Sequence, residues 1–148
     1  MASTGALADA KSRRRAHGDA VAAQRRRWIR RASYYHADLV RYLRSIVPPG
    51  SRVLDVGCGT GAVLASLEPS RGLGIDLSPE MVRVARAEHP ADRFPHLEFR
   101  VGDAEALELG ETFDHVVLSN VIGEMVDVWA AFRALRRACH PSTRAASA

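Results

Sequence analysis

VLDVGCGTG, residues 53–61, is the stretch that decides the fold of this 148-residue chain. Apart from Asp55, its first four residues are branched aliphatic, which suits a strand buried on both faces. Three glycines follow at every second position and let the backbone turn sharply and approach a ligand closely: Gly57, Gly59 and Gly61. Residues 62–67 continue as a short apolar helix. Strand, tight loop and helix in this order are typical of the first βα unit of a Rossmann-like fold.

Asp55 indicates which nucleoside the loop binds. It stands two residues before the first glycine, close to where a dinucleotide-binding loop holds a pyrophosphate. A carboxylate at that place repels phosphate and attracts a cation. S-adenosylmethionine carries an ammonium and a sulfonium group, so it fits this loop better than a dinucleotide does.

Residues 72–76 form a second predicted strand, which ends in Asp76, nineteen residues after Gly57. At that distance, a second parallel strand places a carboxylate beside the ribose hydroxyls. The alternative is that Asp76 only caps the end of its strand. Ser78 is a predicted N-cap with Pro79 at the first helical position, and the helix buries Met81, Val82 and Ala85.

Two further apolar strands are predicted at 97–101 and 113–119, and helices at 24–46 and 126–139. The pattern indicates an α/β fold, a Rossmann-like doubly wound and mostly parallel sheet. The predicted helices carry apolar stripes: Trp28, Ala32, Tyr35, Leu39, Tyr42, Leu43 and Ile46 in the first, and Trp129, Phe132, Leu135 and Ala138 in the second.

The chain resembles the class I S-adenosylmethionine-dependent methyltransferases that act on small molecules. Four segments carry the resemblance, in the order and spacing of that family: VLDVGCGTG at 53–61, GLGIDLSPEMV at 72–82, VGDAEAL at 101–107 and FDHVVLSNVIGEM at 113–125. The resemblance implies that Asp103 and Ala104 contact the adenine and that Leu77 and Met81 cover it. It also implies that residues 119–121 line the bottom of the site near the reacting methyl group. The expected cofactor-binding residues are Asp55, Gly57, Cys58, Gly59, Thr60, Gly61, Asp76, Leu77, Met81, Asp103, Ala104, Ser119, Asn120 and Val121. For Asp103, the alternative is a solvated loop acid.

A general base is required only if the methyl acceptor must lose a proton. The candidates are His36, Tyr34 and Glu124. Many relatives have a histidine where Glu124 stands, and a solvated acid at a helix start is the favoured interpretation of Glu124 over a base. No Pro-Pro-Tyr or Pro-Pro-Phe follows Asn120, which argues against the branch that methylates amino groups of DNA and protein. The 34–36 aromatic cluster resembles a segment that closes over the cofactor, although Tyr35 alone is equally suited to core packing.

The carboxyl end departs from the family pattern. A full family sheet has seven strands, and only four are predicted here. Residues 142–148 lack β-branched and aromatic side chains apart from Thr143, so they are poor strand material and leave one edge of the fourth strand unpaired. The sequence therefore suggests an incomplete domain, with a fused or partner domain beyond it. The alternatives to a methyltransferase are a truncated cofactor-binding module without activity of its own and, from the GxGxxA pattern at 57–62, a nucleotide-dependent oxidoreductase.

Charge is unevenly distributed along the chain. Residues 1–44 hold 11 of the 21 basic residues and 3 acids, a net charge of +8, and the remainder carries −4. Residues 1–20 have few apolar side chains and are predicted to be a disordered, arginine-rich arm, preceding the cofactor-binding domain at 21–148. A solvated arm is favoured over a nucleic-acid surface. No apolar run long enough for a membrane helix or a secretory signal is present, which predicts a cytoplasmic protein. Cys58 and Cys139 predict neither a disulfide nor a zinc site.

Overall fold

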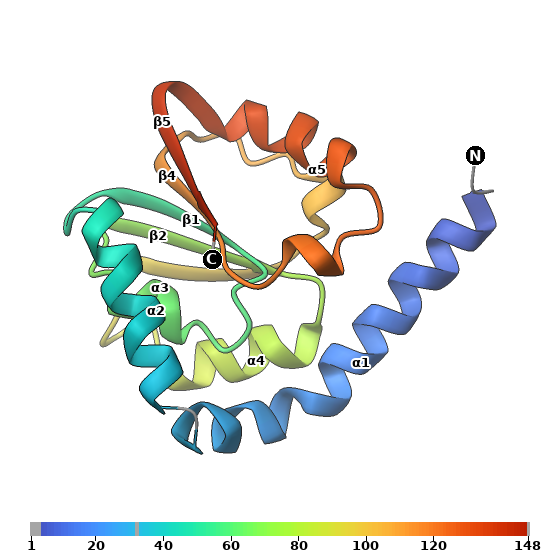
Figure 1. Ribbon diagram of the computed structural model, residues 1–148, viewed down its shortest axis with the longest axis horizontal. Coiled ribbons are helices and arrows are strands. Elements are labelled where there is room, and N and C mark those ends of the chain that lie inside the picture. Colours follow the sequence, from blue (N-terminus) through green and yellow to red (C-terminus); the bar gives the residue numbers. More distant parts are fainter. Residues whose placement is uncertain (1–3, 32, 148) are drawn as a thin grey trace.

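The computed structural model describes residues 4–31 and 33–147, without the side chains of residues 23, 25, 26 and 28–33. Its centre is a sheet of five parallel strands in the order β3-β2-β1-β4-β5 (Figure 1). The strands are β1 (Arg52–Val56), β2 (Arg71–Asp76), β3 (Leu97–Val101), β4 (Phe113–Leu118) and β5 (Cys139–Ser147). The predicted α/β class and the four predicted strands are therefore confirmed.

Helices cover both faces of this sheet. They are α1 (Thr4–Arg31), α2 (Ser33–Ile46), α3 (Ala62–Ser66), α4 (Pro79–Glu88) and α5 (Val128–Leu135). Side chains of α2, α3 and α4 form one core cluster with residues such as Val53 and Val117. Leu135 of α5 belongs to a second cluster with Leu54 and Val116, whose side chains alternate with the first set along the same strands. The sheet is thus covered on both faces, as a doubly wound fold requires.

The helix after Asp76 begins as its sequence predicts. The Ser78 hydroxyl accepts a hydrogen bond from the Met81 amide at 3.1 Å, and Pro79 occupies the first helical position. Met81, Val82 and Ala85 are buried. This capped helix fixes the direction in which the chain leaves β2.

The carboxyl end is a strand, so the prediction of an unpaired edge on β4 is wrong. β5 pairs in parallel with β4, with His115 opposite Arg144 and Val117 opposite Ala146, after an irregularity between Phe113 and His115. Ala146 is buried in the core. The tendency of a segment to form a strand depends on its neighbours. Here the backbone of the apolar strand β4 pairs with the backbone of β5, and the short side chains of β5 are sufficient for this pairing.

The amino-terminal segment also differs from the prediction, because the described part of residues 1–20 is helical and belongs to α1. Alanine and arginine favour helix, and α1 packs on α4. Gly18 faces the Ser78 side chain, and the Asp19 carboxylate accepts hydrogen bonds from the Ser78 hydroxyl at 2.5 Å and from the Glu80 amide at 3.3 Å. Contacts made far along the chain therefore order a segment that has no apolar stripe of its own.

Both predicted helix stripes need correction. The 24–46 helix is divided between α1 and α2, and the side chains of Trp28 and Ala32 lie outside the described residues. In α2, Leu39 and Leu43 are buried, as predicted, but Tyr35 and Tyr42 are each 49% exposed. In α5, Trp129 is 76% exposed, and the buried positions are Ala131 and Leu135, one helical turn apart. The large aromatic side chains of both helices lie at the margins of the buried stripe.

Candidate functional site

A cavity of about 460 Å³ lies at the carboxyl ends of β1, β2 and β4. Gly57, in the loop after β1, has φ of +73°, and a Cβ there would lie 2.4 Å from a methyl carbon of Val121. Gly59 has φ of +53° and faces open space. Both positions adopt the left-handed conformation that favours glycine. The loop can therefore pass close to Val121 while leaving room for a ligand.

Asp76 lies in this cavity at the end of β2. One carboxylate oxygen accepts a hydrogen bond from the Gly59 amide at 2.8 Å, and the other accepts one from the Ser78 amide at 2.9 Å. The carboxylate thus ties the glycine loop to the start of α4. These two backbone bonds fix the carboxylate at the cavity, where its oxygens can also accept hydrogen bonds from a ligand with hydroxyl groups.

Asp55 is placed differently. It is 1% exposed, and neither carboxylate oxygen has a hydrogen-bond partner among the described residues. Burial, reinforced by the charge of Asp76, raises the pKa of Asp55 to about 8. Asp55 lines a second, smaller cavity of about 60 Å³, which adjoins the first because both are lined by Gly57, Gly59, Tyr35, Ser119 and Asn120.

His36 and Cys58 share this smaller cavity with Asp55. The His36 Nε2 atom is buried without a partner among the described residues, and burial lowers the pKa of the ring. Burial raises the pKa of the Cys58 thiol well above its usual value, so Cys58 packs as a small apolar residue. A buried acid without a partner and a partly buried imidazole, whose Nε2 atom has none among the described residues, thus face one small space.

Asp103 lines the large cavity with Ala104, Leu77 and Met81. Its carboxylate is paired: one oxygen accepts from the Glu105 amide at 2.9 Å, and the other lies 2.7 Å from the Lys11 ammonium. Lys11 also pairs with Glu105 at 2.6 Å. Burial alone would lower the pKa of Lys11, but the hydrogen bonds and charges of these two acids raise it. The alternative of a solvated loop acid therefore does not describe Asp103.

The end of β4 forms the floor of both cavities. Ser119 and Asn120 line both, and Val121 lines the large one. Asn120 has φ of +54°, which asparagine tolerates better than most residues. Its side-chain amide contacts the Tyr35 hydroxyl, with the Oδ1 and Nδ2 atoms at 3.2 and 3.1 Å. This contact joins α2 to the floor of the site and gives Tyr35 a place at the cavity rather than in the core.

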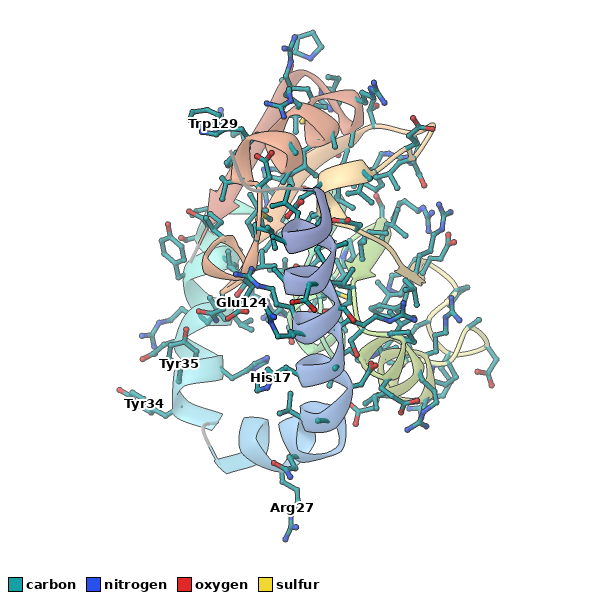
Figure 2. All side chains as sticks on the ribbon, turned by 90° about the vertical axis from the view of Figure 1, so that its right-hand side faces the viewer. His17, Arg27, Tyr34, Tyr35, Glu124 and Trp129 are labelled. Atoms are coloured by element: carbon teal, nitrogen blue, oxygen red, sulfur yellow. The ribbon has the colours of Figure 1, made fainter. Side chains whose placement is uncertain are left out.

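The three candidate bases lie in three different places. Glu124 lines the large cavity, His36 lines the small one, and Tyr34 lines neither. Tyr34 is 81% exposed and points away from the molecule (Figure 2). Among the other predicted residues, Thr60 lines the small cavity, whereas Gly61 lines neither and packs against Phe99. The structure thus brings together thirteen of the fourteen predicted cofactor residues, counting both cavities.

Sequence reasoning missed the contribution of α1. Residues 11, 14, 17, 18 and 21 of this helix line the large cavity, and Figure 2 shows His17 on α1. These positions recur every three or four residues and therefore share one helical face. The spacing of these positions is helical, but most of the residues are polar, so the sequence shows no apolar stripe along this helix.

Two general properties complete the description of the site. Within residues 4–31 and 33–147, no group of three or more histidine, cysteine, aspartate or glutamate side chains is placed to hold a metal ion. None of the helices described is long and apolar enough to cross a membrane.

Comparisons with known proteins agree with this geometry. A family model described as a methyltransferase domain matches residues 54–146. A ubiquinone biosynthesis O-methyltransferase of Xanthomonas oryzae pv. oryzae is 36% identical over 96 residues, which cover 62% of this chain and 40% of that protein. The chain thus spans about two fifths of the length of this curated relative.

Solved structures show the same fold. The putative methyltransferase of Haloferax volcanii, in complex with the Trm112 methyltransferase activator, is similar with a TM-score of 0.73 and 29% identity, over 88% of this chain and 58% of that one. A DhpI–SAH complex is similar with a TM-score of 0.78 over 97% of this chain and 69% of that one. Its identity is 20%, so this second likeness concerns the fold alone.

Proposed function

Because the chain belongs to the methyltransferase domain family, we propose that it binds S-adenosylmethionine and transfers the methyl group to a small-molecule acceptor. The observation that carries the proposal is Asp55, a fully buried carboxylate without a partner among the described residues. An isolated buried charge is costly, and a cationic ligand supplies the missing counter-charge. A dinucleotide would bring more negative charge to the same place.

Different parts of the cofactor would bind in the two cavities. Leu77, Met81 and Asp103 would hold the adenine, and Asp76 would accept hydrogen bonds from the ribose hydroxyls. The small cavity would hold the amino-acid end, with Asp55 receiving the ammonium and the His36 Nε2 group donating to the carboxylate. On this assignment His36 is a binding residue rather than a base.

When bound, S-adenosylmethionine supplies an electrophilic methyl group, which an acceptor atom attacks in line as the carbon–sulfur electron pair returns to sulfur. The protein contributes alignment and the exclusion of water, which commonly lower a barrier by several kcal/mol. The 57–61 loop and the floor at 119–121 would hold the reacting centre, and α1 would cover it. Glu124 is the candidate base that lines the large cavity, for acceptors that must lose a proton.

Calorimetry with S-adenosylmethionine, S-adenosylhomocysteine and NAD tests the proposal. We expect binding of the first two and none of NAD; binding of NAD alone would contradict it. The Asp76→Asn variant should bind S-adenosylhomocysteine at least about tenfold more weakly, because a hydrogen bond to a charged group contributes about 1.5–3 kcal/mol. Asp92→Asn, which changes an exposed aspartate, is the matched control.

A second candidate function is a cofactor-binding module without turnover. The observation that favours it is that, of the three candidate bases, only Glu124 lines the large cavity. Incubation with labelled S-adenosylmethionine and a pool of phenols, amines and carboxylic acids separates the two. Release of a methylated product supports the enzyme, and binding without methyl transfer to any acceptor supports the module.

A further inference from the structure

Arg14 is a cation in the large cavity that the cofactor assignment does not use. It lies on α1, one turn after Lys11, and its side chain lines the cavity. The Nη1 atom of its guanidinium is buried and has no hydrogen-bond partner among the described residues. Lys11, by contrast, is satisfied by Asp103 at 2.7 Å and Glu105 at 2.6 Å. Of the two cations on this face of α1, Arg14 therefore has a buried donor without an acceptor, whereas Lys11 is paired with two carboxylates.

The carboxylates of the cavity do not compensate Arg14. Asp103 and Glu105 are paired with Lys11, and Asp76 accepts from two backbone amides. Glu124 lines the cavity but makes no hydrogen bond or ion pair with the guanidinium within the described part of the chain. A buried donor without an acceptor, here the Nη1 atom, is unfavourable, and the planar fork of guanidinium donors matches a carboxylate or a phosphate.

The cavity walls that the cofactor assignment does not use include polar side chains, among them His17 and Glu124, and a group of three apolar ones. Val21 comes from the same face of α1, and Met125 and Val126 come from the loop after β4. The Val126 amide donates to Glu105, the same carboxylate that Lys11 contacts, so this loop lies beside the turn of α1 that precedes Arg14. The remaining space thus has a mixed lining, in which three apolar side chains line the same cavity as one guanidinium with an unsatisfied donor.

We propose that Arg14 binds an anionic group, a carboxylate or a phosphate, of the methyl acceptor. The inference rests on the proposed function, because it assigns to the acceptor the part of the cavity that S-adenosylmethionine leaves free. It identifies the acceptor as a small molecule that carries an acid group, with an apolar part that Val21, Met125 and Val126 can contact. Arg14 is then a residue that determines specificity.

The test compares acids with matched neutral molecules on protein saturated with S-adenosylhomocysteine. The probes are 4-hydroxybenzoate, cinnamate and phenyl phosphate, each against its amide or, for the phosphate, phenol; the last pair separates phosphate from carboxylate recognition. We expect at least one acid to bind about tenfold more tightly than its neutral partner. Arg14→Gln should reduce this preference to within about twofold, whereas Arg15→Gln, on the exposed side of α1, should retain it.

Three results would overturn the inference. One is that no acid binds better than its neutral partner, and another is that the preference persists in Arg14→Gln. The third is that Arg14→Gln weakens S-adenosylhomocysteine but not 5′-methylthioadenosine, because Arg14 would then hold the carboxylate of the cofactor. Arg14→Lys, which keeps the charge, guards against a folding defect and should retain part of the preference. Wild-type protein that does not bind S-adenosylhomocysteine would instead contradict the proposed function.

Discussion

Replacing Asp55 by asparagine should make the protein more stable at neutral pH. The pKa of the folded-state carboxyl is about 8, against 3.8 for an unperturbed one, so the folded state binds this proton more tightly than the unfolded state does. The free energy of unfolding therefore falls as pH rises from about 4 to about 8 and is independent of this group outside that range. At 1.36 kcal/mol per pH unit, the fall amounts to about 4 kcal/mol by pH 7 (7 − 3.8 = 3.2) and about 6 kcal/mol in total.

Urea unfolding of Asp55→Asn and wild type at pH 4.5, 6, 7 and 8 measures this effect. The difference in unfolding free energy should grow with pH in favour of the variant, while the exposed control Asp92→Asn follows wild type. The same variant should bind S-adenosylhomocysteine weakly, and binding to wild type should tighten toward pH 8 with release of a proton. A pH-independent difference, or undiminished affinity in the variant, would refute the role given to this buried carboxylate.

Two other substitutions test the loop and the helix above it. Gly57→Ala should lower stability and affinity for S-adenosylhomocysteine more than Gly110→Ala does. Both glycines have positive φ, but only Gly57 has Val121 where a Cβ would lie. Equal effects of the two substitutions in thermal melts would show that the contact with Val121 is unimportant. Lys11→Met should speed amide hydrogen exchange in the first half of α1 about fivefold, since partly exposed ion pairs contribute up to about 1 kcal/mol. Arg13→Met should leave the exchange rate unchanged, because its partner Asp9 lies in the same helix. Unchanged exchange in Lys11→Met would mean that the ion pairs of Lys11 do not hold α1 in place.

The sequence predicts the central strands well because their signals are local. Val53, Leu54 and Val56 are branched and apolar, Ser78 and Pro79 mark a helix start, and Asp55 and Asp76 stand where strands end. Neighbouring parallel strands end at the same edge of the sheet, and the two acids accordingly line the two adjoining cavities.

The parts that the sequence does not predict depend on distant partners. β5 has weak strand propensity and is fixed by its pairing with β4. α1 is held by contacts such as Lys11 with Asp103, which are separated by 92 residues. The division of the site into two cavities, with Asp55 in the smaller one, follows from the packing of α2 over the glycine loop and has no local signature.

The position of β1 in the middle of the sheet has a consequence for biosynthesis. β1 leaves the ribosome before every other strand, yet it pairs with β2 on one side and β4 on the other, and His115, the partner of Val53, is translated 62 residues later (115 − 53). Until β4 emerges, a nascent chain has the glycine loop and Asp76 but lacks the floor at Asn120. The elongating polypeptide thus exposes an apolar strand edge while these 62 residues are translated, and this interval is when a chaperone would be of most use.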